Sequence, residues 1–211
     1  KFTFTMPRSK VEIAASFKAA EEPSGFPFTD VTSGDWYYDA VVYAWENDLM
    51  TGTSATTFAP GMTTSRAMLA TLLYRLDGAP DLSGENLGYP YADVEADSWY
   101  GDGVYWARLH GVVTGITSEI FDPNGAITRE QMAAMLYRYA QYKGYDVTGS
   151  ADLSGYADAD SVSDWAGYAM AWAVDSGLIS GVGNNTLNPQ GSATRAEIAT
   201  ILMRFCQQFV Q

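Results

Sequence analysis

The chain has few of the residues that build metal, disulfide or thiol chemistry. Its 211 residues contain one cysteine and one histidine, too few for an internal disulfide or for a zinc site of the usual kind. Cys206 falls in a predicted helix, where we interpret it as a small buried residue; a nucleophilic cysteine would need His110 as its partner. The aspartate-rich segment 158–164 has no glycine at the sixth position of a calcium loop. We therefore expect no metal and no cofactor.

Positive charge is also scarce. The 12 lysines and arginines are outnumbered by 25 aspartates and glutamates, and the formal net charge is −13. This balance argues against nucleic-acid binding and against attraction to an anionic membrane. No apolar run approaches the roughly 18 residues of a membrane-spanning helix. The chain begins with Lys1 and shows no signal peptide, so we expect a fragment of a longer protein.

A set of landmarks recurs three times. In each copy an aspartate and then a tryptophan are followed by a glycine 16 residues after the tryptophan, a proline 8 residues later and an arginine 6 residues after that. This identical spacing identifies an internal repeat of 63 to 66 residues. The landmarks are the repeat aspartates (Asp30, Asp93, Asp158), repeat tryptophans (Trp36, Trp99, Trp165), repeat glycines (Gly52, Gly115, Gly181), repeat prolines (Pro60, Pro123, Pro189) and first arginines (Arg66, Arg129, Arg195).

Residues 1–18 differ from the repeats. Apolar residues alternate on both sides of a Pro-Arg-Ser-Lys turn, which predicts a β-hairpin or strand pair, with a flexible lead-in as the alternative. The segment resembles the closing strands of small β-repeat modules in bacterial surface proteins. A linker is predicted over 19–25, and the repeats follow at 26–80, 81–143 and 144–211 as one compact body.

Two helices joined by a loop are predicted in each copy. The first should begin near the repeat tryptophan, after an N-cap at Asp35, Ser98 or Asp164. The second should begin at Ser65, Thr128 or Thr194. Its apolar residues follow the i, i+3, i+4, i+7 spacing of one buried face: Leu69, Leu72, Leu73 and Leu76; Met132, Met135, Leu136 and Tyr139; Ile198, Ile201, Leu202 and Phe205. One pair cannot bury this face alone, so the copies must pack into a mainly α-helical body, as an open stack or a closed ring.

The first arginines stand where the helix dipole disfavours a cation. Thr194 with Glu197, and Thr128 with Gln131, form capping boxes that explain the helix start and leave the arginine unexplained. It is predicted either to pair with a repeat aspartate or to present its fork to a ligand carboxylate, with free helix N–H groups as further donors. We favour the ligand, although both roles are compatible.

Two other repeated features have competing interpretations. The second arginines, nine residues after the first, point away from them on the same helix, and we predict a structural role near the helix end: Arg75, Arg138 and Arg204. The repeat tryptophans are either core plugs, which is the favoured interpretation, or platforms for sugar rings. Four neighbouring tyrosines are the candidates for an exposed rim: Tyr37, Tyr38, Tyr100 and Tyr168.

Three similar surfaces favour binding over catalysis, because an enzyme usually has one active site. The motifs FTDV, YADV and YADA open the copies, and SRAMLATLLYR, ITREQMAAMLYR and ATRAEIATILMR hold the first arginines. With the tryptophans and glycines between them, these motifs resemble three S-layer homology domains over residues 26–206.

The resemblance implies a closed, pseudo-threefold helical bundle with grooves between the copies. It also implies non-covalent anchoring of a secreted protein to the cell wall of a Gram-positive-type envelope. The implied ligand is secondary cell-wall polysaccharide bearing pyruvylated N-acetylmannosamine, read near the first arginines. The repeat aspartates, repeat glycines and repeat tryptophans complete the implied ligand-binding set. We expect a monomer with no catalytic residue.

Departures from the family pattern leave open which grooves are active. The first copy has Met68 where the motif has glutamate, and the third has Ala159 for valine, Ala166 after its tryptophan and one extra residue before it. An acidic chain repels an anionic polymer at long range, so attachment must depend on local arginine contacts. The alternative functions are a protein-interaction or self-assembly module of a surface layer and, more remotely, a hydrolase of wall polymer.

Overall fold

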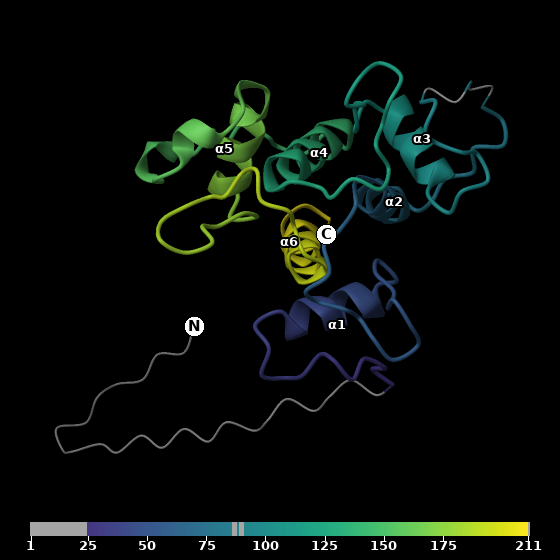
Figure 1. Cartoon of the computed structure of the whole chain (residues 1–211), viewed down its shortest axis with the longest axis horizontal. Helices are drawn as coiled ribbons and strands as arrows, with labels where there is room; N and C mark the ends of the chain where they lie inside the picture. Colours follow the sequence, from purple (N-terminus) through teal and green to yellow (C-terminus); the bar gives the residue numbers. More distant parts are fainter. Residues whose placement is uncertain (1–24, 86–87, 89–90, 211) are drawn as a thin grey trace, which may run out of the picture.

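The computed structural model describes residues 25–85, 88 and 91–210. This part is mainly α-helical, as predicted (Figure 1). Its six α-helices are α1 (Tyr38–Glu46), α2 (Arg66–Leu76), α3 (Gly101–Leu109), α4 (Arg129–Tyr142), α5 (Gly167–Asp175) and α6 (Arg195–Phe209). Three short 3-10 helices precede α5: Leu153–Gly155, Ala159–Ser161 and Asp164–Ala166. The hairpin predicted in 1–18, and the linker up to residue 24, lie outside the described residues.

The helices pack across the copies. The second helix of each copy contacts the first helix of the next, so α2 lies on α3 and α4 lies on α5. The last helix, α6, returns to α1, and Figure 1 shows these two side by side. The alternative of an open stack is therefore wrong, because the third copy packs against the first and the bundle closes into a ring.

The chain segments that precede the second helices join the copies. Three isolated antiparallel β-bridges link Ser65 to Ala126, Thr128 to Ser192 and Thr194 to Thr63. Each bridge connects the N-cap residue of one copy with the residue two positions before the N-cap of the next. The same relationship runs from the first copy to the second, from the second to the third and from the third back to the first.

The repeat prolines have a part in this junction. In α2 the N–H of Arg66 donates to the Gly125 carbonyl (3.0 Å) and the N–H of Ala67 donates to the Pro123 carbonyl (3.1 Å). Equivalent bonds join the first two N–H groups of α4 to the Gly191 and Pro189 carbonyls, and those of α6 to the Met62 and Pro60 carbonyls. The loop of the next copy thus satisfies two donors that a helix start otherwise leaves open.

The first helices begin later than predicted. The structure starts them at Tyr38, Gly101 and Gly167, two residues after each repeat tryptophan, and none of the three has a side-chain N-cap bond. Asp35 instead accepts hydrogen bonds from the N–H and the hydroxyl of Thr32, which closes the preceding turn. Ser98 donates to the Glu95 carbonyl, and Asp164 is the first residue of a 3-10 helix. The polar residue before the tryptophan therefore organises a turn rather than a helix cap.

The second helices begin as predicted, with Ser65, Thr128 and Thr194 as N-caps. The capping boxes predicted in the second and third copies are both present. The first copy has only the bond from the Met68 N–H to the Ser65 hydroxyl, because Met68 stands where the other copies have glutamine or glutamate. The predicted apolar faces are buried except for the partly buried Leu76. Cys206 is buried as well, and burial raises the pKa of its thiol. In the part of the chain that the structure describes, no helix has the length and apolar character that crossing a bilayer requires.

Candidate ligand-binding grooves

The first arginines are buried at the junctions between copies. Each is between 4% and 7% exposed, and burial lowers the pKa of each guanidinium. Arg66 donates through Nε to the Phe121 carbonyl (2.8 Å) and through Nη2 to the Thr114 carbonyl (2.9 Å), both in the second copy. Arg129 bonds in the same way to Leu187 and Ser180, and Arg195 to Phe58 and Thr51. Each first arginine therefore fastens its own helix to the loop of the next copy.

The repeat aspartates hold the same loops by another route. The carboxylate of Asp93 accepts from the backbone N–H groups of Phe121 (2.9 Å) and Asp122 (2.7 Å). Asp30 and Asp158 make the matching pairs of bonds in their copies. The second residue of each clamped pair has a positive φ, as at Asp122 (59°), so the carboxylate stabilises a left-handed turn.

Direct pairing of the first arginines with the repeat aspartates, one of the two predicted alternatives, is wrong. Among the described residues no such ion pair occurs: the aspartate oxygens accept backbone N–H groups, and the guanidinium donates to backbone carbonyls. The two side chains instead bind one residue from opposite sides, with Arg66 on the carbonyl of Phe121 and Asp93 on its N–H. The repeat aspartates are not among the residues that line the grooves described below.

The prediction that the backbone N–H groups at the start of the second helices are free to bind a ligand is also wrong. The first two N–H groups of each second helix bond to the next copy, and the third bonds to the N-cap hydroxyl of Ser65, Thr128 or Thr194. A ligand at this place would meet side chains rather than helix N–H groups. The first arginine remains a cationic group at the site.

Three grooves lie beside these junctions, and each takes residues from all three copies. Each groove is named after the second helix that lines it. In the α4 groove, of about 400 Å³, α4 and the loop around Gly115 are joined by Arg66 of the first copy and Trp165 of the third. The α6 groove, of about 360 Å³, contains Arg129, Gly181, Arg204 and Trp36. The α2 groove, of about 240 Å³, contains Arg195, Gly52, Arg75 and Trp99.

The second arginines belong to these grooves, which the sequence analysis missed. Arg138 faces away from Arg129 on their shared helix, but it lines the α4 groove together with Arg66 of the preceding copy. Arg204 meets Arg129, and Arg75 meets Arg195, in the same way. The sequence signal that could have indicated a groove role was the recurrence of this second arginine in all three copies of an acidic chain. The pairing depends on how the copies pack, which helix periodicity alone does not give.

The repeat tryptophans are at the groove rims and not in the core. Trp36 is 68% exposed, Trp99 61% and Trp165 55%, so the favoured core interpretation is wrong and the platform alternative fits. The core is filled instead by Trp106 and Trp172 from the first helices. Of the four rim tyrosines predicted, Tyr168 is exposed, Tyr37 and Tyr100 are half-buried, and Tyr38 is buried.

The repeat glycines let a loop pass close to its own backbone. A Cβ on Gly115 would lie 2.5 Å from the Ile120 carbonyl oxygen and 2.6 Å from the Tyr91 ring. Gly52 is equally restricted, whereas a Cβ on Gly181 would meet its nearest atom, the Thr186 carbonyl oxygen, at 3.1 Å. Glycine is therefore required on steric grounds in the α2 and α4 grooves, and the third copy is more permissive.

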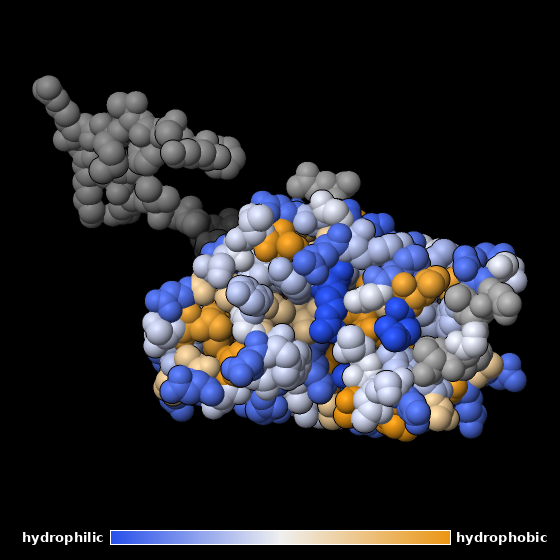
Figure 2. Space-filling model, turned by 90° about the horizontal axis from the view of Figure 1, so that it is seen from above, coloured by the Kyte–Doolittle hydropathy of each residue, from blue (hydrophilic) through white to orange (hydrophobic). Residues whose placement is uncertain are grey.

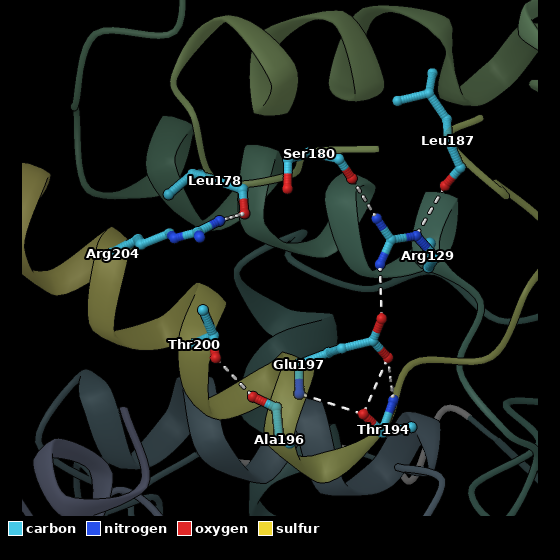
Figure 3. Close-up of polar contacts among 9 residues, drawn as sticks. All are labelled: Arg129, Leu178, Ser180, Leu187, Thr194, Ala196, Glu197, Thr200 and Arg204. Carbon is cyan, nitrogen blue, oxygen red and sulfur yellow. Dashed lines mark hydrogen bonds and ion pairs between the residues drawn. The ribbon is translucent and has the colours of Figure 1, made fainter. Parts of the chain in front are cut away.

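The α6 groove contains a carboxylate of its own. Glu197 Oε1 accepts from Nη1 of Arg129 at 3.1 Å, and Figure 3 shows the two side chains pointing toward each other between α4 and α6. The same figure shows Arg204 reaching toward the Leu178 carbonyl. Burial lowers the pKa of Arg129, and the Coulomb attraction of Glu197 opposes that shift. The equivalent residues, Gln131 and Met68, have no charge.

The molecular surface is mixed in character. Figure 2 shows a band of strongly hydrophilic residues crossing one face of the body, with hydrophobic patches on both sides of it. Within the described residues, no group of three or more histidine, cysteine, aspartate or glutamate side chains is arranged to hold a metal ion. Arginine side chains and an exposed tryptophan line each of the three grooves, and the α6 groove also contains the Glu197 carboxylate.

Comparison with known proteins gives three matched segments and several relatives. Residues 27–68, 90–133 and 155–199 match the model of the S-layer homology domain. The chain is 32% identical over 192 residues to an endoglucanase of Bacillus sp. (strain KSM-635), an alignment that covers 91% of the chain and 20% of that protein. It is 33% identical over 150 residues to the surface-layer 125 kDa protein of Lysinibacillus sphaericus, covering 70% of the chain and 12% of that protein.

A third relative, the cellulosome-anchoring protein of Acetivibrio thermocellus, is 26% identical over 148 residues, which cover 70% of the chain and 33% of that protein. The chain thus spans a third or less of the length of each of these relatives, the endoglucanase included. What the enzyme and the surface proteins share with it is the repeated segment. The three copies, matched in order along the chain, make it a member of the S-layer homology domain family.

Proposed function

We propose that this chain anchors a secreted bacterial protein to the cell wall by binding pyruvylated secondary cell-wall polysaccharide in the grooves between its copies. Membership of the S-layer homology family indicates a location at the cell surface or in the cell wall. It also points to a non-catalytic anchoring module, because the enzyme relatives match over only 9–20% of their length. The polysaccharide and the groove chemistry are the further step.

One observation carries this proposal: two arginines and an exposed tryptophan meet in every groove, although they come from three different copies. A guanidinium fork matches the geometry of a carboxylate. The face of an indole ring suits the apolar C–H surface of a sugar. A saccharide that bears a carboxylate, such as a pyruvate ketal, is the ligand that uses both groups at once.

The charge of the chain is consistent with short-range recognition. A net charge of −13 repels an anionic polymer at a distance, but this repulsion is screened beyond about 8–10 Å at ordinary salt. Six of the eight lysines and arginines after residue 25 are first or second arginines, and all six line a groove. Positive charge is therefore concentrated where the polymer would be held.

The relatives give independent support. One is named a cellulosome-anchoring protein and another a surface-layer protein, and both share the repeated segment with this chain. An endoglucanase shares it as well. A segment shared by proteins with such different names, one of them named for anchoring, supports a role in attachment.

The test uses the second arginines, because the first arginines also hold the fold together. Arg75, Arg138 and Arg204 are replaced together by glutamine, and sedimentation with purified wall polysaccharide is measured. Arg108→Gln is the matched control, since Arg108 is an exposed arginine of α3 outside the grooves. We expect the triple variant to remain folded and to lose at least about tenfold in affinity, the effect of one charge-assisted hydrogen bond. Equal binding by the triple variant and the control would contradict the proposal.

A further inference from the structure

Glu130, the second residue of α4, is a buried carboxylate that occurs in one copy only. It is 2% exposed, and the equivalent residues of α2 and α6 are alanines, Ala67 and Ala196. Burying a carboxylate costs free energy unless hydrogen-bond donors surround the charge. The donors that surround Glu130 come from the third copy.

Two residues of the third copy supply these donors. Glu130 Oε2 accepts from the N–H of Ser163 (3.0 Å), and Oε1 accepts from the hydroxyl of Ser163 (2.9 Å) and from Nε2 of Gln190 (2.8 Å). The backbone N–H of Glu130 donates to the Pro189 carbonyl (3.0 Å). Glu130 thus joins two separate segments of the third copy, one that precedes Trp165 and one that follows the repeat proline.

Ser163 begins the turn that carries Trp165. Its carbonyl accepts from the N–H of Ala166 (2.8 Å), and the turn continues as the 3-10 helix Asp164–Ala166, which contacts α4 directly. Ala166 is buried, whereas Trp165 is 55% exposed and lines the α4 groove. The tryptophan at this groove therefore belongs to a turn whose first residue is bound by Glu130.

The first and second copies hold the equivalent turns with their own residues. Asp35 accepts from the N–H of Thr32 (2.7 Å), and the hydroxyl of Ser98 donates to the Glu95 carbonyl (2.6 Å). In both copies the two partners lie within the four residues before the repeat tryptophan. The third copy has one extra residue before its tryptophan, and its Ser163 bonds to the second copy. The insertion thus coincides with a turn held by the neighbouring copy.

We propose that Glu130 is a positioning residue of the α4 groove, which holds Trp165 of the third copy at the rim where a sugar ring would stack. This inference rests on the proposed function, because the rim position affects affinity only if a saccharide lies there. Glu130 is not among the residues that line the groove, so it acts through the tryptophan. An indole ring that is held in place before binding loses less conformational freedom when the ligand arrives, which favours affinity.

The hold on the tryptophan can be measured without a ligand. Each of the six tryptophans gives one indole N–H signal in an NMR spectrum, and Trp165→Phe and Trp36→Phe assign the two signals needed. In Glu130→Ala, which copies the alanine of the other two copies, we expect the order parameter of the Trp165 indole to fall by about 0.2, the difference between a rigid and a flexible site. The signal of Trp36, whose turn is held locally, should not change. An unchanged order parameter at Trp165 would overturn the positioning role.

The effect on binding is measured with a double-mutant cycle, by sedimentation with purified wall polysaccharide. Glu130→Ala should weaken binding about twofold to tenfold, the cost of immobilising one side chain on binding. The double variant with Trp165→Ala should bind no more weakly than Trp165→Ala alone. In a Trp36→Ala background, which alters the α6 groove, Glu130→Ala should still weaken binding. A general loss of stability would instead weaken binding in both backgrounds.

Two milder variants keep the test open if Glu130→Ala does not fold. Ser163→Ala removes the hydroxyl bond and keeps the bond from the Ser163 N–H, and Glu130→Gln keeps the side-chain size but replaces one acceptor oxygen by an amide NH₂ group. Each should lower the Trp165 order parameter and the affinity by less than Glu130→Ala does. A thermal melt of each variant verifies folding.

The outcomes separate this inference from the function on which it rests. A further loss of affinity in the double variant, or full affinity in folded Glu130→Ala or Trp165→Ala, would overturn the inference and leave polysaccharide binding by the arginines standing. Failure of the unmodified chain to sediment with wall polysaccharide would overturn the proposed function itself. The order parameter of Trp165 would then still decide whether Glu130 holds the turn.

Discussion

Arg66 and Asp93, from different copies of the repeat, bind opposite sides of one residue, Phe121. The guanidinium takes its carbonyl at 2.8 Å and the carboxylate takes its N–H at 2.9 Å. The arrangement recurs with Arg129, Leu187 and Asp158, and with Arg195, Phe58 and Asp30. The repeated arginine therefore acts first as a connection between copies, and the repeated aspartate holds the loop that the arginine binds. The remaining guanidinium N–H groups face a groove.

Replacing Arg66 by lysine should reduce stability although the charge is kept. An ammonium group cannot satisfy the Phe121 and Thr114 carbonyls with the same planar fork. Leaving buried acceptors poorly paired should lower the free energy of unfolding by about 2–4 kcal/mol. Urea denaturation measures the change, and Arg75→Lys, at an exposed second arginine, is the control that should change it by less than about 0.5 kcal/mol. Equal effects at the two positions would contradict the connecting role.

The Asp158 carboxylate should make the third copy sensitive to acid. Hydrogen bonds from Leu187 and then Asn188 hold the pKa of Asp158 below its usual value. A lowered folded-state pKa means that the carboxylate stabilises the fold above its unfolded pKa of about 3.9 and loses this effect as the pH falls through the lower folded-state value. Asp158→Asn should therefore lower the melting temperature at pH 7 and have less effect near pH 3. Melting curves at both values check this; a pH-independent difference would refute it.

The repeat glycines should differ in their tolerance of alanine. At Gly115 a Cβ would collide with backbone carbonyl oxygens that cannot move away, and at Gly181 the nearest atom is 3.1 Å distant. We expect Gly115→Ala to cost at least about 2 kcal/mol of stability and Gly181→Ala less than about 1 kcal/mol. Paired denaturation curves provide the comparison. Similar losses at both sites would show that close approach is not the reason for the glycine.

Substitutions of two tryptophans should affect stability and binding differently. Trp106 is fully buried, so Trp106→Ala should cost about 3–5 kcal/mol, whereas Trp165 is 55% exposed and Trp165→Ala should cost less than about 1 kcal/mol. The groove variant should nevertheless bind wall polysaccharide more weakly. Calorimetric melting and polysaccharide sedimentation measure the two effects. A folded Trp165→Ala protein with full affinity would remove this tryptophan from the site.

Much of this architecture can be predicted from the sequence because the three copies of the repeat can be compared with one another. The capping boxes at Thr128 and Thr194 and the apolar faces of the second helices follow from local periodicity, and the structure confirms them. The N-cap pattern predicted a start for the first helices that is too early, because Asp35 closes a turn with Thr32 instead of capping α1. Propensity alone does not distinguish these two uses of an aspartate.

The grooves were harder to predict because they are made by packing between copies. Helix geometry places Arg138 on the opposite side of α4 from Arg129, and only ring closure puts Arg138 beside Arg66. The exposure of the repeat tryptophans has the same origin, because each lies against the groove of a neighbouring copy rather than its own core. Sequence periodicity describes one helix at a time, so a site shared by three copies lies beyond it.

The central claim is that a carboxylate-bearing wall saccharide lies in a groove built from three copies. A crystal structure of the chain with a pyruvylated N-acetylmannosamine disaccharide tests it most directly. We predict the carboxylate within hydrogen-bond distance of an arginine of one groove and a sugar ring against the tryptophan at its rim, as Arg66, Arg138 and Trp165 would allow in the α4 groove. A disaccharide bound outside the three grooves, or one whose carboxylate points into solvent away from the arginines, would contradict the account.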